Sequence, residues 1–209
     1  EYPYTTILQE STSESTAYSL KELGYSTHAI HNNTGTFYDR NLIYSMLGFD
    51  TFTSSEYMKN AEENPLGWIK DKVLTEEILK ALTSTEERDY IYTVSVQGHG
   101  KYPKAPLDIP QSITLTDSGE LNEEDIAAFE YYVNQLKEMD SFISDILREI
   151  QSYPEPTVVV FYGDHLPSLG IEDEDLSSGT TYSTEYIIWS NFFMVKADKD
   201  LYAYQISSE

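Results

Sequence analysis

The chain has 209 residues, and its 13 basic and 36 acidic residues give a formal net charge of -23. This excess of negative charge argues against nucleic acid or an anionic membrane surface as a general partner, because both require a basic footprint. The absence of cysteine excludes a disulfide framework and thiolate zinc sites. With 40% hydrophobic and 23% charged residues, the composition is that of an ordinary globular domain.

The sequence contains no apolar run near the roughly 18 residues that a membrane-spanning helix needs. Glu1 begins neither a signal peptide nor a natural translation start. We therefore expect the chain to be a piece of a longer protein.

The first part of the chain alternates helical and strand patterns. Ser11–Leu23 has a Ser/Thr-rich start and Gly24 as a stop, which predicts a helix, and Tyr25–His31 alternates like a strand. The near-helical spacing in Thr36–Leu47 predicts a second helix, and Phe49–Phe52 is a brief apolar return. This order is typical of a βαβ arrangement.

The middle of the chain contains two long segments rich in breakers. Ser54–Gly67 is polar and is expected to be a surface excursion, whereas Trp68–Leu82 has a helical pattern. The second clear strand is predicted at Tyr90–Val96. Lys101–Gly119 contains three prolines and is a long loop that we expect to act as a lid or rim.

The last part of the chain is predicted to supply the longest helix and the final strands. Apolar residues step by three or four through Asn122–Ile150. Val158–Tyr162 is apolar without alternation, which is typical of a strand covered on both faces in a parallel sheet, and Glu185–Val195 is the last core strand or strands. The pattern predicts an α/β fold, a three-layer sandwich with a mostly parallel central sheet.

The stretch Gly163-Asp164-His165 follows the Val158–Tyr162 strand directly, at the edge where open α/β sheets place ligand sites. A carboxylate beside an imidazole is a plausible half of a divalent-metal site. The alternative is an ordinary turn in which the aspartate caps the loop and the histidine is merely polar.

Three of the four histidines, His31, His99 and His165, follow predicted strands. Carboxyl ends of parallel strands share one edge of the sheet, so these three side chains are expected to converge. His28 lies inside its strand and is expected to be structural.

Arg40 follows the loop after His31, and its guanidinium suits phosphate or sulfate oxygens. The alternative is a surface arginine paired with a carboxylate. The sequence has no P-loop, dinucleotide fingerprint or Gly-x-Ser-x-Gly elbow.

Three segments resemble one known family. They are GYSTHAIHNNTGTFYDRNLIYSMLGFDTF (Gly24–Phe52), SVQGHGKY (Ser95–Tyr102) and VVVFYGDHLPSLG (Val158–Gly170). They are similar to the extracytoplasmic catalytic domain of lipoteichoic acid synthases and related phosphoglycerol transferases, in the sulfatase and alkaline phosphatase superfamily. The resemblance implies that residues 1–209 are part of a single such domain, incomplete on its N-terminal side.

The resemblance also implies a reaction. In that family a threonine attacks the phosphorus of phosphatidylglycerol and passes glycerol phosphate to a polymer or glycolipid acceptor, with Mn²⁺ or Mg²⁺ as cofactor. Asp164 and His165 would be metal ligands by this resemblance. The resemblance further implies that the longer protein is anchored in the cell membrane by N-terminal transmembrane helices.

Four further residues match substrate positions of the family. His31 and Arg40 match positions that hold the phosphate and glycerol, His99 matches another phosphate contact, and Tyr38 stands where close relatives often carry tryptophan. The family's nucleophilic threonine and metal-binding glutamate lie upstream of the helix that ends at Gly24. We therefore assign neither to this chain and expect it to be inactive alone.

Two other functions stay open at this point. A sulfatase or a phosphoethanolamine transferase would use the same scaffold on a different head group. A non-catalytic envelope domain that binds a polyanion is the second alternative, although a net charge of -23 opposes polyanion capture.

Overall fold

The computed structural model describes residues 6–8, 10–116, 119 and 121–192. The helices and strands, in chain order, are α2 (Thr16–Glu22), β1 (Tyr25–His31), η1 (Phe37–Asp39), α3 (Arg40–Met46), β2 (Thr51–Ser54), η2 (Ser55–Tyr57), α4 (Val73–Leu82), β3 (Arg88–Val94), α5 (Glu123–Gln151), β4 (Val158–Tyr162), η3 (Asp173–Asp175) and β5 (Tyr186–Ser190). Among the described residues, no helix has both the length and the apolarity to cross a bilayer.

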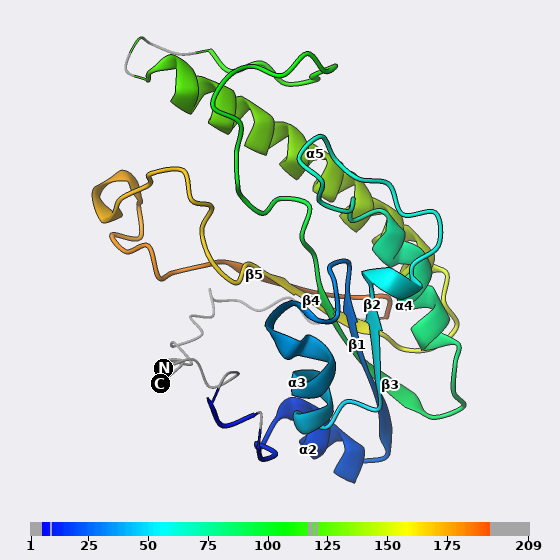
Figure 1. Ribbon diagram of the computed structural model, residues 1–209. Coiled ribbons are helices and arrows are strands. Elements are labelled where there is room, and N and C mark those ends of the chain that lie inside the picture. The colour runs from blue at the N-terminus through cyan, green and yellow to red at the C-terminus, as the bar shows by residue number, and fades with distance from the viewer. Residues whose placement is uncertain (1–5, 9, 117–118, 120, 193–209) are drawn as a thin grey trace.

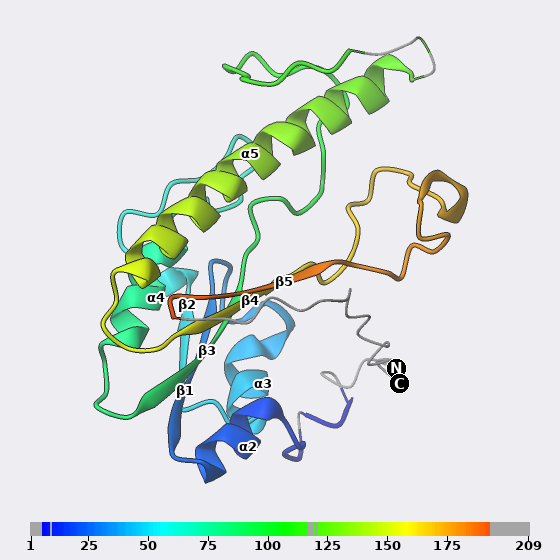
Figure 2. The same ribbon diagram turned by 180° about the vertical axis from the view of Figure 1, so that it is seen from behind.

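The centre of the fold is a parallel sheet with the strand order β2-β1-β3. Helices α2 and α3 lie on one face of this sheet, and α4 and α5 lie on the other (Figures 1 and 2). The predicted α/β class and its three layers are confirmed.

Strand β1 is the middle strand and has the predicted bounds. Thr27, Ala29 and Ile30 are at most 1% exposed, because strands pair on both edges of β1 and helices cover both of its faces. Ile30 belongs to the main hydrophobic cluster, which it shares with Leu74 of α4 and with the last turns of α5. The carboxyl end of β1 is therefore held rigidly.

Helix α5 confirms the prediction of a long amphipathic helix after residue 121. The Asn122 side chain caps it by accepting a 2.9 Å hydrogen bond from the amide of Asp125. The loop that precedes α5 is held against it by Asn134, which accepts from the amides of Ser112 and Ile113. The loop around Ser112 and Ile113 therefore packs along α5.

Strand β4 differs from the prediction. Among the described residues it pairs only with β5, in an antiparallel two-stranded sheet, and its residues alternate between exposed and half-buried. Val159 and Phe161 pack on the core, whereas Val158 and Val160 are 55% and 51% exposed. The expectation that this strand is covered on both faces is wrong, because α5 lies against only one face. Residues 193–195 of the predicted last strand fall outside the described residues.

The segment before α4 also differs from the prediction. Helix α4 begins at Val73, five residues later than the apolar pattern predicts, and Asn64 and Met58 are buried although their segment looks like a surface excursion. The cause is a buried polar network that engages the backbone of residues 64–71 in contacts outside any helix. Similarly, α2 begins only at Thr16, because Ser15 accepts a hydrogen bond from the amide of Tyr18 and caps the helix.

Candidate functional site

His31 is the last residue of β1 and lies at the carboxyl edge of the parallel sheet. It is only 3% exposed, and its Nδ1 has no hydrogen-bond partner among the described residues. Burial, followed by the positive charge of Arg40, lowers the pKa of His31 from 6.5 to about 4, while the Asp164 carboxylate acts in the opposite direction. His31 is therefore neutral at physiological pH in this structure and offers a hydrogen-bonding ring nitrogen to a ligand.

A sharp turn after β1 presents Tyr38 and Arg40. Tyr38 has φ 56° and Asp39 has φ 53°, so two successive non-glycine residues adopt the left-handed conformation. Such residues cost free energy and cluster at functional sites. The turn leaves the Tyr38 ring 66% exposed and starts α3 at Arg40.

Arg40 is held by neutral groups. Its Nη1 donates to the Thr34 carbonyl at 3.3 Å, and the guanidinium lies 4.9 Å from the centre of the Phe37 ring. Within the described part of the chain, no carboxylate forms an ion pair with it. Burial lowers the Arg40 pKa, but a guanidinium stays charged in proteins. Among the described residues, the alternative of a surface arginine paired with a carboxylate therefore has no partner to support it.

A cavity of about 390 Å³ joins these groups. His31, Tyr38, Arg40 and Asp164 line it, so residues from the ends of β1 and β4 and from the turn before α3 meet there. Aromatic side chains form much of its remaining wall, namely Tyr44, Phe49, Tyr90 and Tyr92. Its polar groups combine a buried imidazole and a guanidinium with one carboxylate.

Asp164 and His165 follow β4 as predicted, and both side chains are exposed. Asp164 Oδ2 lies 3.7 Å from His165 Nε2, and Asp164 Oδ1 accepts a hydrogen bond from the His165 amide at 2.9 Å. Gly163 precedes them because a Cβ there would lie 2.6 Å from Thr184 Oγ1. A close approach of Thr184 therefore requires the glycine.

The donor set of Asp164 and His165 fits a divalent metal. His165 Nδ1 contacts the Leu166 carbonyl at 2.8 Å, and since a carbonyl oxygen only accepts, Nδ1 carries the proton. Nε2 then has a free lone pair on the side of the Asp164 carboxylate, which is the arrangement that metal-binding histidines adopt. Among the described residues, no cluster of three or more histidine, aspartate or glutamate side chains forms a full ligand set.

His99 lies beside His165, so two of the three histidines that were expected to converge are neighbours. The two rings are 5.9 Å apart at an interplanar angle of 90°. His99 Nδ1 contacts the Gly100 carbonyl at 2.6 Å, which again leaves Nε2 as the acceptor. His28, expected to be structural, is buried between Thr51 and Asp89 at 2.8 and 3.1 Å.

One contact at this site escaped the sequence reasoning. The Trp68 ring packs against His99 with 5.3 Å between ring centres. Trp68 looks like the first residue of a helix in sequence, and only the preceding breakers Asn64-Pro65 and Gly67 signal a loop there.

Comparison with known sequences and structures identifies the family of the chain. A sequence profile of the Sulfatase family matches residues 2–203. The chain belongs to the Sulfatase family. The expected membership of the sulfatase family is thus confirmed.

This Sulfatase-family chain is similar to two curated bacterial proteins. It is 31% identical over 146 residues to a protein of Rhizobium meliloti named for cyclic beta-1,2-glucan modification, which is 70% of this chain and 22% of the relative. It is 26% identical over 159 residues to lipoteichoic acid synthase 2 of Bacillus subtilis, which is 75% of this chain and 23% of the relative.

A solved structure extends the likeness to three dimensions. The Streptococcus pyogenes phosphoglycerol transferase GacH, in complex with sn-glycerol-1-phosphate, superposes with a TM-score of 0.66 and 26% sequence identity. The match covers 84% of this chain and 46% of the GacH chain. The Sulfatase-family chain thus spans about half of this solved relative and less than a quarter of the two curated relatives.

Proposed function

We propose that the longer protein is a metal-dependent phosphoglycerol transferase of the cell envelope, and that residues 1–209 are part of its single extracytoplasmic catalytic domain. One observation carries the proposal. His31, Tyr38 and Arg40 share one cavity with Asp164, although more than a hundred residues separate the two segments. The likeness to a phosphoglycerol transferase in complex with sn-glycerol-1-phosphate supports the choice of substrate.

The substrate-binding half of the proposed site consists of His31, Tyr38 and Arg40. The guanidinium of Arg40 binds two phosphate oxygens as a forked donor, and it is held against the Phe37 ring by a cation–π contact of 4.9 Å. A bound phosphate would favour protonation of the buried His31 ring, which would then donate one further hydrogen bond to the phosphate. The exposed ring of Tyr38 forms a wall against the glycerol moiety, and His99 contacts the phosphate from the side of His165.

The metal-binding half consists of Asp164 and His165, which would hold Mn²⁺ or Mg²⁺ through a carboxylate oxygen and through Nε2. Such a cation supplies charge neutralisation at the phosphoryl group and activation of an oxygen nucleophile. Asp164 lines the same cavity as Arg40, so one phosphoryl group bound there would lie within reach of both the carboxylate and the guanidinium. The threonine nucleophile and the glutamate ligand are not assigned to any residue of this chain.

The donor in this proposal is a phosphatidylglycerol-type head group, and the acceptor is a glycolipid or a polymer of the envelope. Arg40 and His31 recognise the shared phosphate, so these residues alone do not select glycerol over ethanolamine. Tyr38 is the residue that we expect to make this selection, because its exposed ring lines the same cavity as His31 and Arg40.

The test is release of diacylglycerol from phosphatidylglycerol by the full-length protein with Mn²⁺. Asp164→Ala should lower the rate by about a hundredfold or more, because loss of a ligand removes several kcal/mol of charge stabilisation. The matched control is Glu174→Ala, which removes an exposed carboxylate from the η3 turn and should leave the rate unchanged. Equal rates for the wild type and Asp164→Ala would exclude Asp164 from the metal site.

Parallel assays separate the alternatives. Turnover of an aryl sulfate, or of phosphatidylethanolamine, in place of phosphatidylglycerol would assign the protein to the sulfatase or phosphoethanolamine branch. A non-catalytic binding domain would turn over none of these, and its melting temperature would be unaffected by Mn²⁺.

A further inference from the structure

A buried carboxylate, Asp71, lies two residues before α4 and is 0% exposed. Its Oδ1 accepts three hydrogen bonds, from Asn32 Nδ2 at 2.8 Å and from the amides of Val96 and Gln97 at 3.2 Å each. The Asp71 amide in turn donates to Gln97 Oε1 at 2.8 Å. A single side chain thus connects the segment after β1 with the segment after β3.

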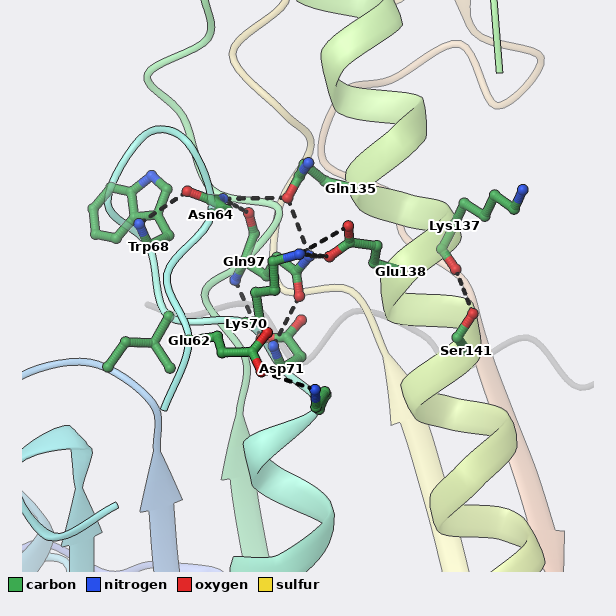
Figure 3. A network of polar contacts seen from close by, with 12 residues as sticks. Glu62, Asn64, Trp68, Lys70, Asp71, Gln97, Gln135, Lys137, Glu138 and Ser141 are labelled. Carbon is green, nitrogen blue, oxygen red and sulfur yellow. Dashed lines mark hydrogen bonds and ion pairs between the residues drawn. The ribbon is translucent and has the colours of Figure 1, made fainter. Parts of the chain in front are cut away.

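The network extends from Gln97 to helix α5 (Figure 3). Gln97 Nε2 donates to Gln135 Oε1 at 3.1 Å and to Glu138 Oε2 at 2.6 Å. Asn64 Nδ2 contacts the Gln97 carbonyl and Gln135 Oε1, each at 3.2 Å. Asn64, Gln97 and Gln135 are all at least 96% buried, so this part of the network is shielded from water, whereas Glu138 lies at its exposed end.

A buried carboxylate is an expensive way to hold a loop. Desolvation raises the pKa of Asp71, and its Oδ2 has no hydrogen-bond partner among the described residues. Apolar side chains of similar volume often stabilise a core as well or better. An apolar side chain could not accept the three hydrogen bonds of Asp71 Oδ1. Their donors lie in the segments that follow β1 and β3.

Both strand ends carry proposed site residues. Asn32 is the residue after His31, and Gln97 precedes His99 by two positions. The loop before α4, which contains Asp71, also contacts His99 through Trp68. Asn64 Oδ1 accepts a hydrogen bond from the Trp68 amide at 3.0 Å, and the Trp68 ring packs on His99. The loop therefore contacts the surroundings of both histidines without lining the cavity.

We propose that Asp71 is a positioning residue that fixes the ends of β1 and β3 relative to each other and so sets the separation of His31 and His99. Its catalytic importance rests on the proposed function, but the positioning itself does not. Asp71 touches neither histidine and is assigned no chemical step.

The imidazole NMR signals of the 209-residue chain test the positioning directly, since only four histidines contribute. In Asp71→Ala the His31 and His99 signals should shift, while His28, between Thr51 and Asp89, serves as the unshifted reference. Asp71→Asn keeps an acceptor oxygen at the position of Oδ1 and should restore both signals towards those of the wild type. Asp71→Ser, with a shorter acceptor, should fall between the two and replaces the alanine variant if that variant does not fold.

The matched control is Glu77→Ala. Glu77 is also a buried carboxylate, 7% exposed, but it pairs with Lys80 on α4 and takes no part in the network. This variant should lower the melting temperature without moving the His31 or His99 signals. A folded Asp71→Ala or Asp71→Ser chain with unchanged His31 and His99 signals would overturn the proposal.

An activity arm separates this proposal from the proposed function. In the full-length protein, Asp71→Ala should lower kcat for glycerol phosphate transfer by roughly 10 to 100-fold, as loss of supporting contacts at active sites does, with recovery in Asp71→Asn. Shifted histidine signals together with a wild-type protein that transfers no glycerol phosphate would retain the positioning role and refute the function. Unshifted histidine signals together with an active wild-type protein would refute the positioning role and retain the proposed function.

Discussion

Replacing His31 by glutamine should weaken the acid sensitivity of the fold. In the folded chain the His31 pKa is about 4, and in the unfolded chain it is near 6.5. As the pH falls from about 6.5 to about 4, the unfolded chain binds a proton that the folded chain refuses. His31 therefore contributes stability that is fully present above pH 6.5 and is lost across this window.

The structure gives the magnitude of this loss. The difference between 6.5 and about 4 corresponds to roughly 3 kcal/mol, at about 1.4 kcal/mol for each pKa unit. His31 is 3% exposed, so solvent screening does not reduce this estimate much. Glutamine is neutral at all these pH values, so His31→Gln should remove this contribution to the pH dependence.

The assay is urea unfolding of the wild type and of His31→Gln at pH 7 and at pH 4, followed by circular dichroism. Between pH 7 and pH 4 the free energy of unfolding should fall by about 3 kcal/mol more in the wild type than in the variant. The carboxylates titrate in both proteins, so their contribution to the pH dependence cancels in the comparison. An identical pH dependence in the two proteins would refute the inference that burial and Arg40 keep His31 neutral.

Three further changes have defined outcomes. Leu74→Ala empties a fully buried core position and should lower the free energy of unfolding by about 2 to 5 kcal/mol in urea titrations, whereas a loss below 1 kcal/mol would mean that the cluster around α4 is not close-packed. Asn122→Ala removes the cap of α5 and should cost about 1 kcal/mol, and an unchanged urea midpoint would argue against the cap. Arg40→Lys keeps the charge but loses the fork, so calorimetry with the full-length protein should show about tenfold weaker binding of sn-glycerol-1-phosphate, and equal affinity would contradict bidentate binding.

Sequence patterns predicted the elements whose environment is set locally. The alternation of Tyr25–His31 gave β1 its bounds, and the apolar spacing after Asn122 gave α5. Strand β4 shows what such patterns do not predict, namely how many faces of a strand are covered. An unbroken apolar run fits coverage on one face or on two, and only tertiary packing decides that Val158 and Val160 are exposed.

The candidate site divides in the same way. His31 and Asp164 were singled out because both follow apolar strands, and both line one cavity, although β4 pairs antiparallel with β5 and not with the sheet of β1. Asp71 and Trp68 were not, because their roles depend on contacts with segments more than twenty residues away in sequence. Asp71 lies within the segment whose apolar pattern predicts a helix, and it looks like an ordinary polar position there until its partners Asn32 and Gln97 are known.

The most direct test of the proposed site is a crystal structure of the full-length protein with Mn²⁺ and sn-glycerol-1-phosphate. We predict an anomalous Mn²⁺ peak within coordination distance of an Asp164 carboxylate oxygen and His165 Nε2, with the phosphate in hydrogen-bond contact with Arg40 and His31. A metal bound elsewhere, or a phosphate that does not touch Arg40, would contradict the proposed site.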